Sequence, residues 1–218
     1  MKVKICGITQ PDQGRAIAQL GADALGFICV RSSPRYVMPV QIHRVIAGMS
    51  DLASEPGYVG VFANAPVEEI VDVVAQSGVN AVQLHGQESP AFCEQLRAAL
   101  PGMMLIKAFR IRVAEDLCSL NAFTPQVDAL LLDAYHPHLL GGTGKTLDWA
   151  ALHQFQPDRP WFLAGGLTPE NVQDALSQLQ PNWIDLSSGV ERSPGDKDLT
   201  KVAKLFEALM FLNASKKA

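Results

Sequence analysis

The stretch YVGVFANAPVEEIVDVVAQSGVNAVQLHG (residues 58–86) contains one unit of the pattern that sets the fold. It begins and ends with short apolar runs, YVGVF (58–62) and AVQLH (81–85), whose length suits a strand and is too short for a core helix. Between them, VEEIVDVVAQSG places Ile70 and Val74 on one face of a helix. The stretch therefore predicts a strand, an amphipathic helix and a second strand.

The same unit recurs along the whole chain. Starts of successive apolar runs are 21 to 34 residues apart, and helix-like segments lie between them. Eight strands alternating with helices are typical of the α/β class and predict a single (β/α)8 TIM barrel spanning residues 1–218, without a linker or domain boundary. The other six runs are VKICG (3–7), ALGFI (24–28), MLIKAF (104–109), ALLLDA (129–134), WFLAGG (161–166) and WIDLSSG (183–189).

A doubly wound open sheet is the structural alternative. Such a sheet usually has fewer strands, and a glycine-rich nucleotide loop often follows its first strand. Here only Gly7 follows the first run, so the barrel is favoured.

Helix starts are predicted where a capping side chain precedes a proline, because the cap accepts an orphan N–H and proline has none to satisfy. Asn64, Ser89 and Thr168 fit this pattern, and Thr9 can also begin a helix. A final amphipathic helix is expected over 198–212, followed by the polar tail NASKKA. The segment 111–127 has the weakest helical pattern because of Pro125 and scattered polar residues.

Composition argues against nucleic-acid and membrane partners. The net charge is −4, 48% of residues are hydrophobic, and no apolar stretch approaches the roughly 20 residues of a membrane span. The start MKVKICGIT lacks the apolar core of a signal peptide.

The cysteines and histidines give little sign of a disulfide framework or a metal site. Four cysteines without a CxxC pair indicate free thiols, as expected in the reducing cytoplasm: Cys6, Cys29, Cys93 and Cys118. His136 and His138 form an H-x-H around Pro137, a weak metal-site pattern.

Polar residues at the ends of the predicted strands are the candidates for chemistry, because barrel active sites lie at the carboxyl ends of strands. They are Cys6, Gln83, His85, Asp133, Asp185, Ser187 and Ser188. Lys4 and Asp185 are both expected inside the barrel, where each needs a partner. Cys6 alone stays open between a small buried hydrophobe, which its residue type favours, and a catalytic thiol. Asp133 ends a three-leucine strand, where a carboxylate is costly to desolvate, so function is favoured over a helix cap.

Glycine-rich turns predict a phosphate site. AGGLTPEN (164–171) and SSGVE (187–191) follow the seventh and eighth runs, where barrels often bind phosphate, so Gly165, Gly166, Ser188 and Gly189 are candidate phosphate ligands. GGTGKT (141–146) is not a P-loop, because Leu139 stands where its first glycine is required, and an ATPase is rejected. A mobile glycine loop over the barrel mouth fits better, making Gly142 and Gly144 candidate substrate contacts together with His85.

Taken in series, the motifs resemble a known family. KICGIT, GADALGFI followed by SPRYV, VGVFAN, QLHG, LLLDA, GGTGKTLDW, AGGLTPENV and DLSSGVE occur in this order. Together they look like the phosphoribosylanthranilate isomerases of tryptophan biosynthesis, over residues 2 to about 198.

The resemblance implies an Amadori rearrangement of N-(5-phosphoribosyl)anthranilate to 1-(2-carboxyphenylamino)-1-deoxyribulose 5-phosphate, without a metal or organic cofactor. It implies that Asp133 is the general acid, Cys6 the general base, and Arg35 the residue that binds the anthranilate carboxylate. The site must then hold Cys6 as thiolate and Asp133 protonated, the reverse of their preference in solution. The expected protein is a monomer or homodimer that binds a small phosphorylated substrate.

Two other functions stay open at this point. A related barrel isomerase, such as the aminoaldose isomerase of histidine biosynthesis, uses two aspartates, and Cys6 argues against it. A catalytically silent barrel would bind a phosphorylated ligand or a partner enzyme, but the presence of both Cys6 and Asp133 argues against silence.

Overall fold

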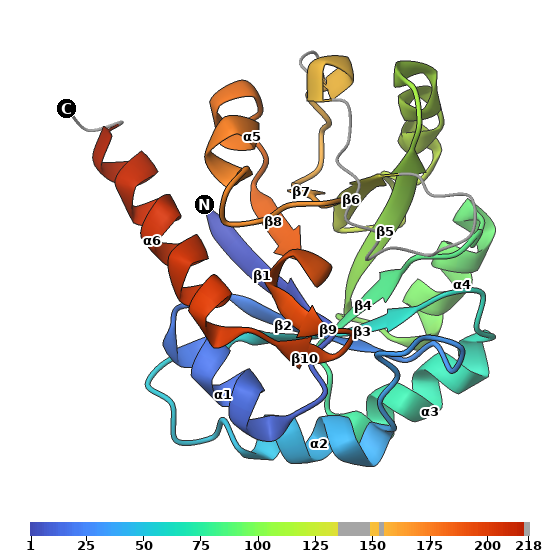
Figure 1. Cartoon of the computed structure of the whole chain (residues 1–218). Coiled ribbons are helices and arrows are strands. Elements are labelled where there is room, and N and C mark those ends of the chain that lie inside the picture. The colour runs from blue at the N-terminus through green and yellow to red at the C-terminus, as the bar shows by residue number, and fades with distance from the viewer. Residues whose placement is uncertain (135–148, 153–154, 216–218) are drawn as a thin grey trace.

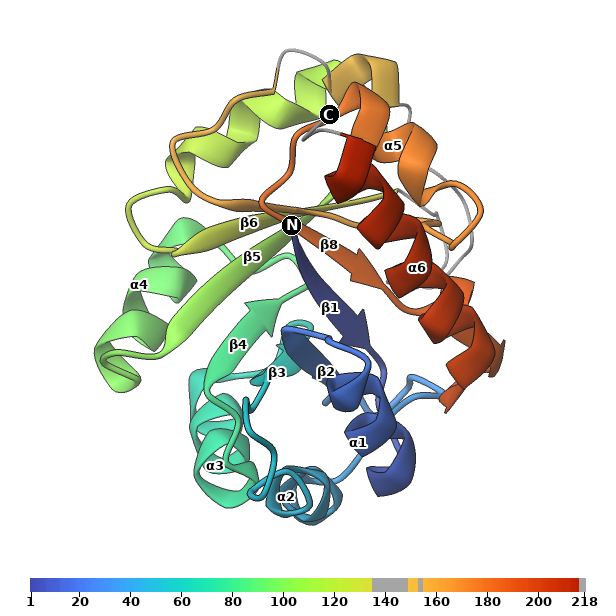
Figure 2. The ribbon, with the colours of Figure 1, turned by 90° about the vertical axis from the view of Figure 1, so that its left-hand side faces the viewer.

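Eight parallel strands form a closed barrel in the computed structural model, which describes residues 1–134, 149–152 and 155–215. The strands follow one another around the ring in chain order, with β8 hydrogen-bonded to β1, which excludes the open sheet. Helices lie outside the ring of strands (Figure 1, Figure 2). The strands are β1 (Lys2–Cys6), β2 (Ala24–Ile28), β3 (Gly57–Phe62), β4 (Ala81–Leu84), β5 (Met104–Ile111), β6 (Ala129–Ala134), β7 (Trp161–Leu163) and β8 (Trp183–Leu186).

Each predicted run overlaps one of these strands, and the (β/α)8 barrel is confirmed. The outer layer contains six α-helices among the described residues, while the segment after β5 is a 3-10 helix, in agreement with its weak pattern. The helices are α1 (Pro11–Gln19), α2 (Pro39–Ala47), α3 (Val67–Ser77), α4 (Pro90–Ala99), η1 (Ala114–Ala122), η2 (Trp149–Leu152), α5 (Val172–Gln178), η3 (Ser188–Val190) and α6 (Leu199–Ser215).

Only one of the predicted helix caps is confirmed. Ser89 accepts the N–H of Phe92 at the start of α4, as expected. Asn64 does not cap α3, because its Oδ1 accepts the N–H of Gln87 in the loop after β4. Thr168 lies one turn before α5 and accepts the N–H of Glu170, while Thr9 donates its hydroxyl to Gly195 O and does not cap α1.

The final helix is longer than expected. It ends at Ser215, so the first three residues of the segment assigned to the tail are helical. α6 packs against α1 and α5, which closes the outer layer around the first and last strands of the barrel.

Side chains along each strand point alternately into the barrel and towards the helices, which gives the protein two separate hydrophobic cores. A small cluster that includes Ala108, Leu131 and Phe162 fills the barrel, while Leu130 and Leu132 belong to the larger core between strands and helices. Because side chains alternate, Asp133 shares the inward face with Leu131. The strand therefore delivers a carboxylate to the carboxyl end of the barrel.

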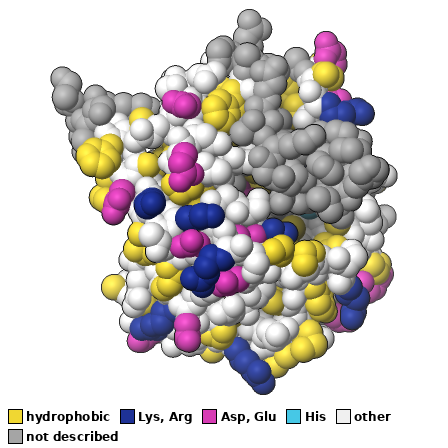
Figure 3. All heavy atoms as spheres, in the orientation of Figure 1, with side chains coloured by type: hydrophobic (Ala, Val, Ile, Leu, Met, Phe, Trp, Pro, Cys, Tyr) yellow, Lys and Arg dark blue, Asp and Glu magenta, His cyan; other side chains and the backbone are white. Residues whose placement is uncertain are grey.

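A short antiparallel hairpin follows β8 and joins the barrel to α6. It comprises β9 (Glu191–Ser193) and β10 (Asp196–Lys197). On the face shown in Figure 3, positive and negative side chains are interspersed among the described residues. No helix in the described ranges combines the length and apolar character needed to cross a bilayer.

Candidate active site

The candidate residues from different strands line one cavity at the carboxyl ends of the barrel strands. Its volume is about 520 Å³, which suits a small organic substrate. Cys6 and Asp133, from strands that are not neighbours, both line it. The other predicted site residues that line it are Arg35, His85, Gly165, Gly166, Ser188 and Gly189, together with Gln83, Asp185 and Ser187.

Cys6 is the last residue of β1, and its thiol has space because the neighbouring strand carries a glycine. Cys6 is paired with Gly26 in the ladder, and a Cβ at Gly26 would lie 2.6 Å from Sγ. The thiol is buried, and this burial raises the pKa of Cys6 above its ordinary value, with Lys4 opposing the rise. This direction favours the neutral thiol of Cys6 over the thiolate near neutral pH.

A buried ion pair lies beside the thiol. Lys4 Nζ is 2.9 Å from Asp185 Oδ1, and both side chains point into the barrel as their alternation predicts. Burial raises the pKa of Asp185, and the ammonium of Lys4 opposes that rise. The pair gives each buried charge a partner and places a cation near Cys6.

Asp133 lies beside His85 on the other side of the cavity. His85 Nε2 is 3.3 Å from Asp133 Oδ2, and the other ring nitrogen, Nδ1, is 3.0 Å from Gln83 Nε2. Gln83 thus contacts one ring nitrogen of His85, while the other ring nitrogen faces Asp133.

The turn after β7 and the turn after β8 are in direct contact at Gly189, where there is no room for a side chain. A Cβ at Gly189 would lie 1.9 Å from Leu167 O, so only glycine fits there. Gly165 and Gly166 have φ angles of 86° and 64°, which glycine adopts without strain. Asn171 fixes the first turn by donating to Gly166 O and accepting the N–H of Thr168. The two glycine turns predicted from sequence are thus adjacent in space.

Arg35 lines the same cavity from the loop after β2, but it has a partner that sequence reasoning missed. Its Nη2 is 2.7 Å from Glu191 Oε2 and its Nε is 3.0 Å from Oε1. Burial acts to raise the pKa of Glu191, yet Arg35 and Lys197 hold it below its ordinary value. No local pattern marks this pair, because the two residues are 156 positions apart.

Four candidate residues lie outside the described ranges. They are Gly142 and Gly144 of the GGTGKT loop and the two histidines of the H-x-H, His136 and His138. Among residues 1–134, 149–152 and 155–215, no three His, Cys, Asp or Glu side chains are grouped as metal ligands.

Comparisons with known proteins agree with this architecture. The family model "N-(5'phosphoribosyl)anthranilate (PRA) isomerase" matches residues 3–208. The chain belongs to the phosphoribosylanthranilate isomerase family. The match confirms the resemblance of the eight motifs and disfavours the aminoaldose isomerase of histidine biosynthesis.

Members of the phosphoribosylanthranilate isomerase family align over almost the full chain. The N-(5'-phosphoribosyl)anthranilate isomerase of Nostoc punctiforme is 61% identical over 209 residues, covering 96% of this chain and 98% of its own. Monomers generated from the dimeric phosphoribosylanthranilate isomerase of Thermotoga maritima have also been solved. That structure has a TM-score of 0.83 at 31% identity, covering 97% of this chain and 99% of its own. A further solved structure, of phosphoribosylanthranilate isomerase in complex with reduced 1-(o-carboxyphenylamino)-1-deoxyribulose 5-phosphate, has a TM-score of 0.82 at 33% identity, covering 97% of this chain and 99% of its own.

Proposed function

We propose that this chain isomerises N-(5'-phosphoribosyl)anthranilate in tryptophan biosynthesis, with Asp133 as general acid and Cys6 as general base. The observation that carries the proposal is the presence of both side chains in one cavity, on strands that are not neighbours. A substrate lying between β1 and β6 can meet an acid and a base without either group having to move across the site.

The reaction divides into two proton transfers. Asp133 protonates the furanose oxygen, which opens the ring and leaves a cationic iminium next to sugar carbon 2. Cys6 then removes the proton from that carbon, and the resulting enol becomes the amino-ketose. His85, with its Nε2 3.3 Å from Asp133, orients the acid.

The preference of Cys6 for the neutral thiol requires a proton transfer before these two steps. Burial disfavours a thiolate at Cys6, while the ammonium of Lys4 favours it. We therefore propose that the thiol proton passes to Asp133 before ring opening. Cys6 is then the thiolate that acts as base and Asp133 the protonated acid, with one proton on the pair throughout.

The substrate carries two anionic groups, a phosphate and a carboxylate, and the cavity lining includes candidate partners for both. We propose that the phosphate is bound by backbone N–H groups of Gly165, Gly166, Ser188 and Gly189, and the anthranilate carboxylate by Arg35. The ligand bound to the related solved protein carries both a phosphate and a carboxyphenyl group, which supports this arrangement.

Replacing Gly189 by alanine is expected to weaken binding of inorganic phosphate, measured as competitive inhibition. The added Cβ would overlap Leu167 O and force the two turns apart. Loss of a charge-assisted contact is worth roughly 1.5–3 kcal/mol, or about 10- to 100-fold in the inhibition constant. Gly48→Ala, where the nearest atom is at 3.4 Å, is the matched control. An anion that in a soaked crystal bound only at 141–146 would contradict the site.

Replacing Arg35 by alanine is expected to lower kcat/KM by about 10- to 100-fold, mainly through KM, because the carboxylate it binds does not react. Arg35→Lys should recover only part of this loss, since lysine lacks the planar fork of donors. Steady-state kinetics with the anthranilate substrate measure both effects. An unchanged kcat/KM in Arg35→Ala would show that the carboxylate binds elsewhere.

Assembly and compartment are the remaining parts of the proposal. The related Thermotoga maritima protein is dimeric, and we expect this chain to be a monomer or a homodimer, which light scattering distinguishes. All four cysteines are free in the structure, in keeping with the reducing cytoplasm expected from the sequence.

A further inference from the structure

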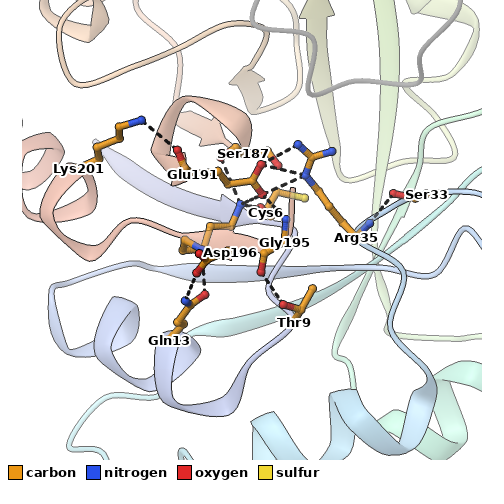
Figure 4. A network of polar contacts seen from close by, with 11 residues as sticks. Cys6, Thr9, Gln13, Ser33, Arg35, Ser187, Glu191, Gly195, Asp196 and Lys201 are labelled. Carbon is orange, nitrogen blue, oxygen red and sulfur yellow. Dashed lines mark hydrogen bonds and ion pairs between the residues drawn. The ribbon is translucent and has the colours of Figure 1, made fainter. Parts of the chain in front are cut away.

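The hairpin after β8 brings two buried charges to the edge of the cavity, and the reaction scheme above uses neither of them. Glu191 lies in β9 and Lys197 in β10, and both side chains are almost completely buried. Figure 4 shows Glu191 beside Arg35, with Cys6 close by. Buried charges are costly unless they are paired, so this arrangement calls for a physical reason.

Glu191 holds the guanidinium of Arg35 in one plane. Arg35 donates Nε–H to the carboxylate at 3.0 and 3.2 Å and Nη2–H at 2.7 Å. A guanidinium has five N–H donors, so the pairing leaves donors on Nη1 and Nη2 for a ligand in the cavity that Arg35 lines. One edge of the fork is fixed by the protein, and the other can receive a second carboxylate.

Lys197 ties Glu191 to the end of β1. Its Nζ donates to Glu191 Oε1 at 2.8 Å, to Ser187 O at 3.2 Å and to the backbone oxygen of Cys6. These bonds use all three donors of the ammonium. The carboxylate of Glu191 is thus shared by the cations of Arg35 and Lys197. These three side chains together keep one net positive charge, which suits an anionic ligand.

The hairpin is anchored so that this geometry is fixed. Thr9 donates its hydroxyl to Gly195 O, Gln13 Oε1 accepts the N–H of Lys197, and Gly195 N–H donates to Glu191 Oε1 (Figure 4). Gly7 permits the close crossing, since a Cβ there would lie 2.8 Å from Arg35 Cδ and 3.4 Å from Lys197 Nζ.

We propose that Glu191 is a positioning residue that aims Arg35 at the substrate carboxylate, and that Lys197 sets the place of Glu191 relative to Cys6. The anthranilate end and the reacting carbon are then held at a fixed spacing by one buried network. The proposal rests on the carboxylate-binding role of Arg35 proposed above. In the opposite case Glu191 would compete with the substrate for Arg35, and its removal would tighten binding.

The test is the variant Glu191→Gln with two inhibitors, the reduced product analogue and the same compound without its carboxylate. We expect KM and the inhibition constant of the carboxylate-bearing analogue to rise by about tenfold, with kcat changed much less. The inhibition constant of the analogue without a carboxylate should stay the same. Equal weakening of both analogues, no change, or tighter binding would overturn the proposal.

A double-mutant cycle separates this proposal from the role of Arg35. If Glu191 acts through Arg35, the double variant Arg35→Ala/Glu191→Gln should bind the carboxylate-bearing analogue as weakly as Arg35→Ala and no weaker. Additive losses would overturn the positioning role. If Arg35→Ala alone had no effect on binding of this analogue, the carboxylate-binding role of Arg35 would be refuted. That result differs from additive losses, which would overturn only the positioning role of Glu191.

Loss of the buried carboxylate can destabilise the fold, because Lys197 then lacks its counter-charge. The variant Glu191→Gln/Lys197→Met removes both charges and is expected to recover melting temperature without recovering KM. Recovery of KM together with stability would show that Glu191 is only structural. Arg192→Gln, which breaks the exposed pair with Asp196 on the same hairpin, is the matched control and should leave KM unchanged.

Discussion

Replacing Cys6 by serine is expected to lower turnover by about 10²–10⁴-fold, the usual contribution of a general base, while the protein stays folded. Serine keeps the size of the side chain beside Gly26 but is a much poorer base near neutral pH. Single-turnover rates and melting temperature are measured on the same sample. Cys93→Ser, a buried cysteine in α4, is the matched control and should lower stability without lowering turnover.

The pH profile gives a second expected result for Cys6. In the proposed mechanism Cys6 and Asp133 share one proton both before and during the reaction, so a change of pH does not interconvert the two arrangements. Because burial raises the pKa of Cys6 above 9.0, kcat/KM should stay level through neutral pH and fall only above pH 9.0, where the pair loses its proton. In Cys6→Ser this alkaline fall in kcat/KM should disappear.

The two measurements on Cys6→Ser also define a contrary result. A variant with a lower melting temperature but nearly unchanged turnover would show that Cys6 is a buried structural thiol.

Replacing Asp133 by asparagine is expected to cause a loss of similar size, about 10²–10⁴-fold. Asparagine keeps the shape of the protonated acid and can still face His85, but it has no acidic proton for the ring oxygen. Turnover is measured with the same single-turnover assay. Asp128→Asn, just before the start of β6, is the matched control, because Asp128 accepts from Arg97 and from the N–H of Leu105, away from the cavity.

A contrary result is easy to recognise. If Asp133→Asn kept its turnover while Asp128→Asn lost stability only, ring opening would need another acid. Asp185 would then be the alternative acid, because it also lines the cavity and burial raises its pKa.

Much of the fold was predictable from the sequence because the barrel repeats one simple pattern. Apolar runs of strand length identify the strands, and alternation along β6 puts Asp133 on the inward face with Leu131. The same alternation predicted that Lys4 and Asp185 both point into the barrel, where the structure shows that they pair with each other. Such features depend on near neighbours in sequence and on the regular geometry of a closed sheet.

The features that the sequence did not predict depend mostly on contacts between segments that are far apart in the chain. Asn64, Thr168 and Thr9 fit a helix-cap pattern, but loops from other parts of the chain, or a local turn at Thr168, take their hydrogen bonds instead. Glu191 lies in a predicted glycine turn, yet its partner Arg35 is 156 residues away. A sequence pattern locates the end of a strand, while only the folded chain shows which charged groups meet there.

The division of labour between Asp133 and Cys6 is tested most directly with substrate carrying deuterium at sugar carbon 2. In Cys6→Ser, proton removal from that carbon should limit the rate, so single-turnover measurements should give a large primary isotope effect. In Asp133→Asn, ring opening should limit the rate, and the isotope effect should be close to unity. An isotope effect near unity in Cys6→Ser, or a large one in Asp133→Asn, would contradict the assignment of base and acid.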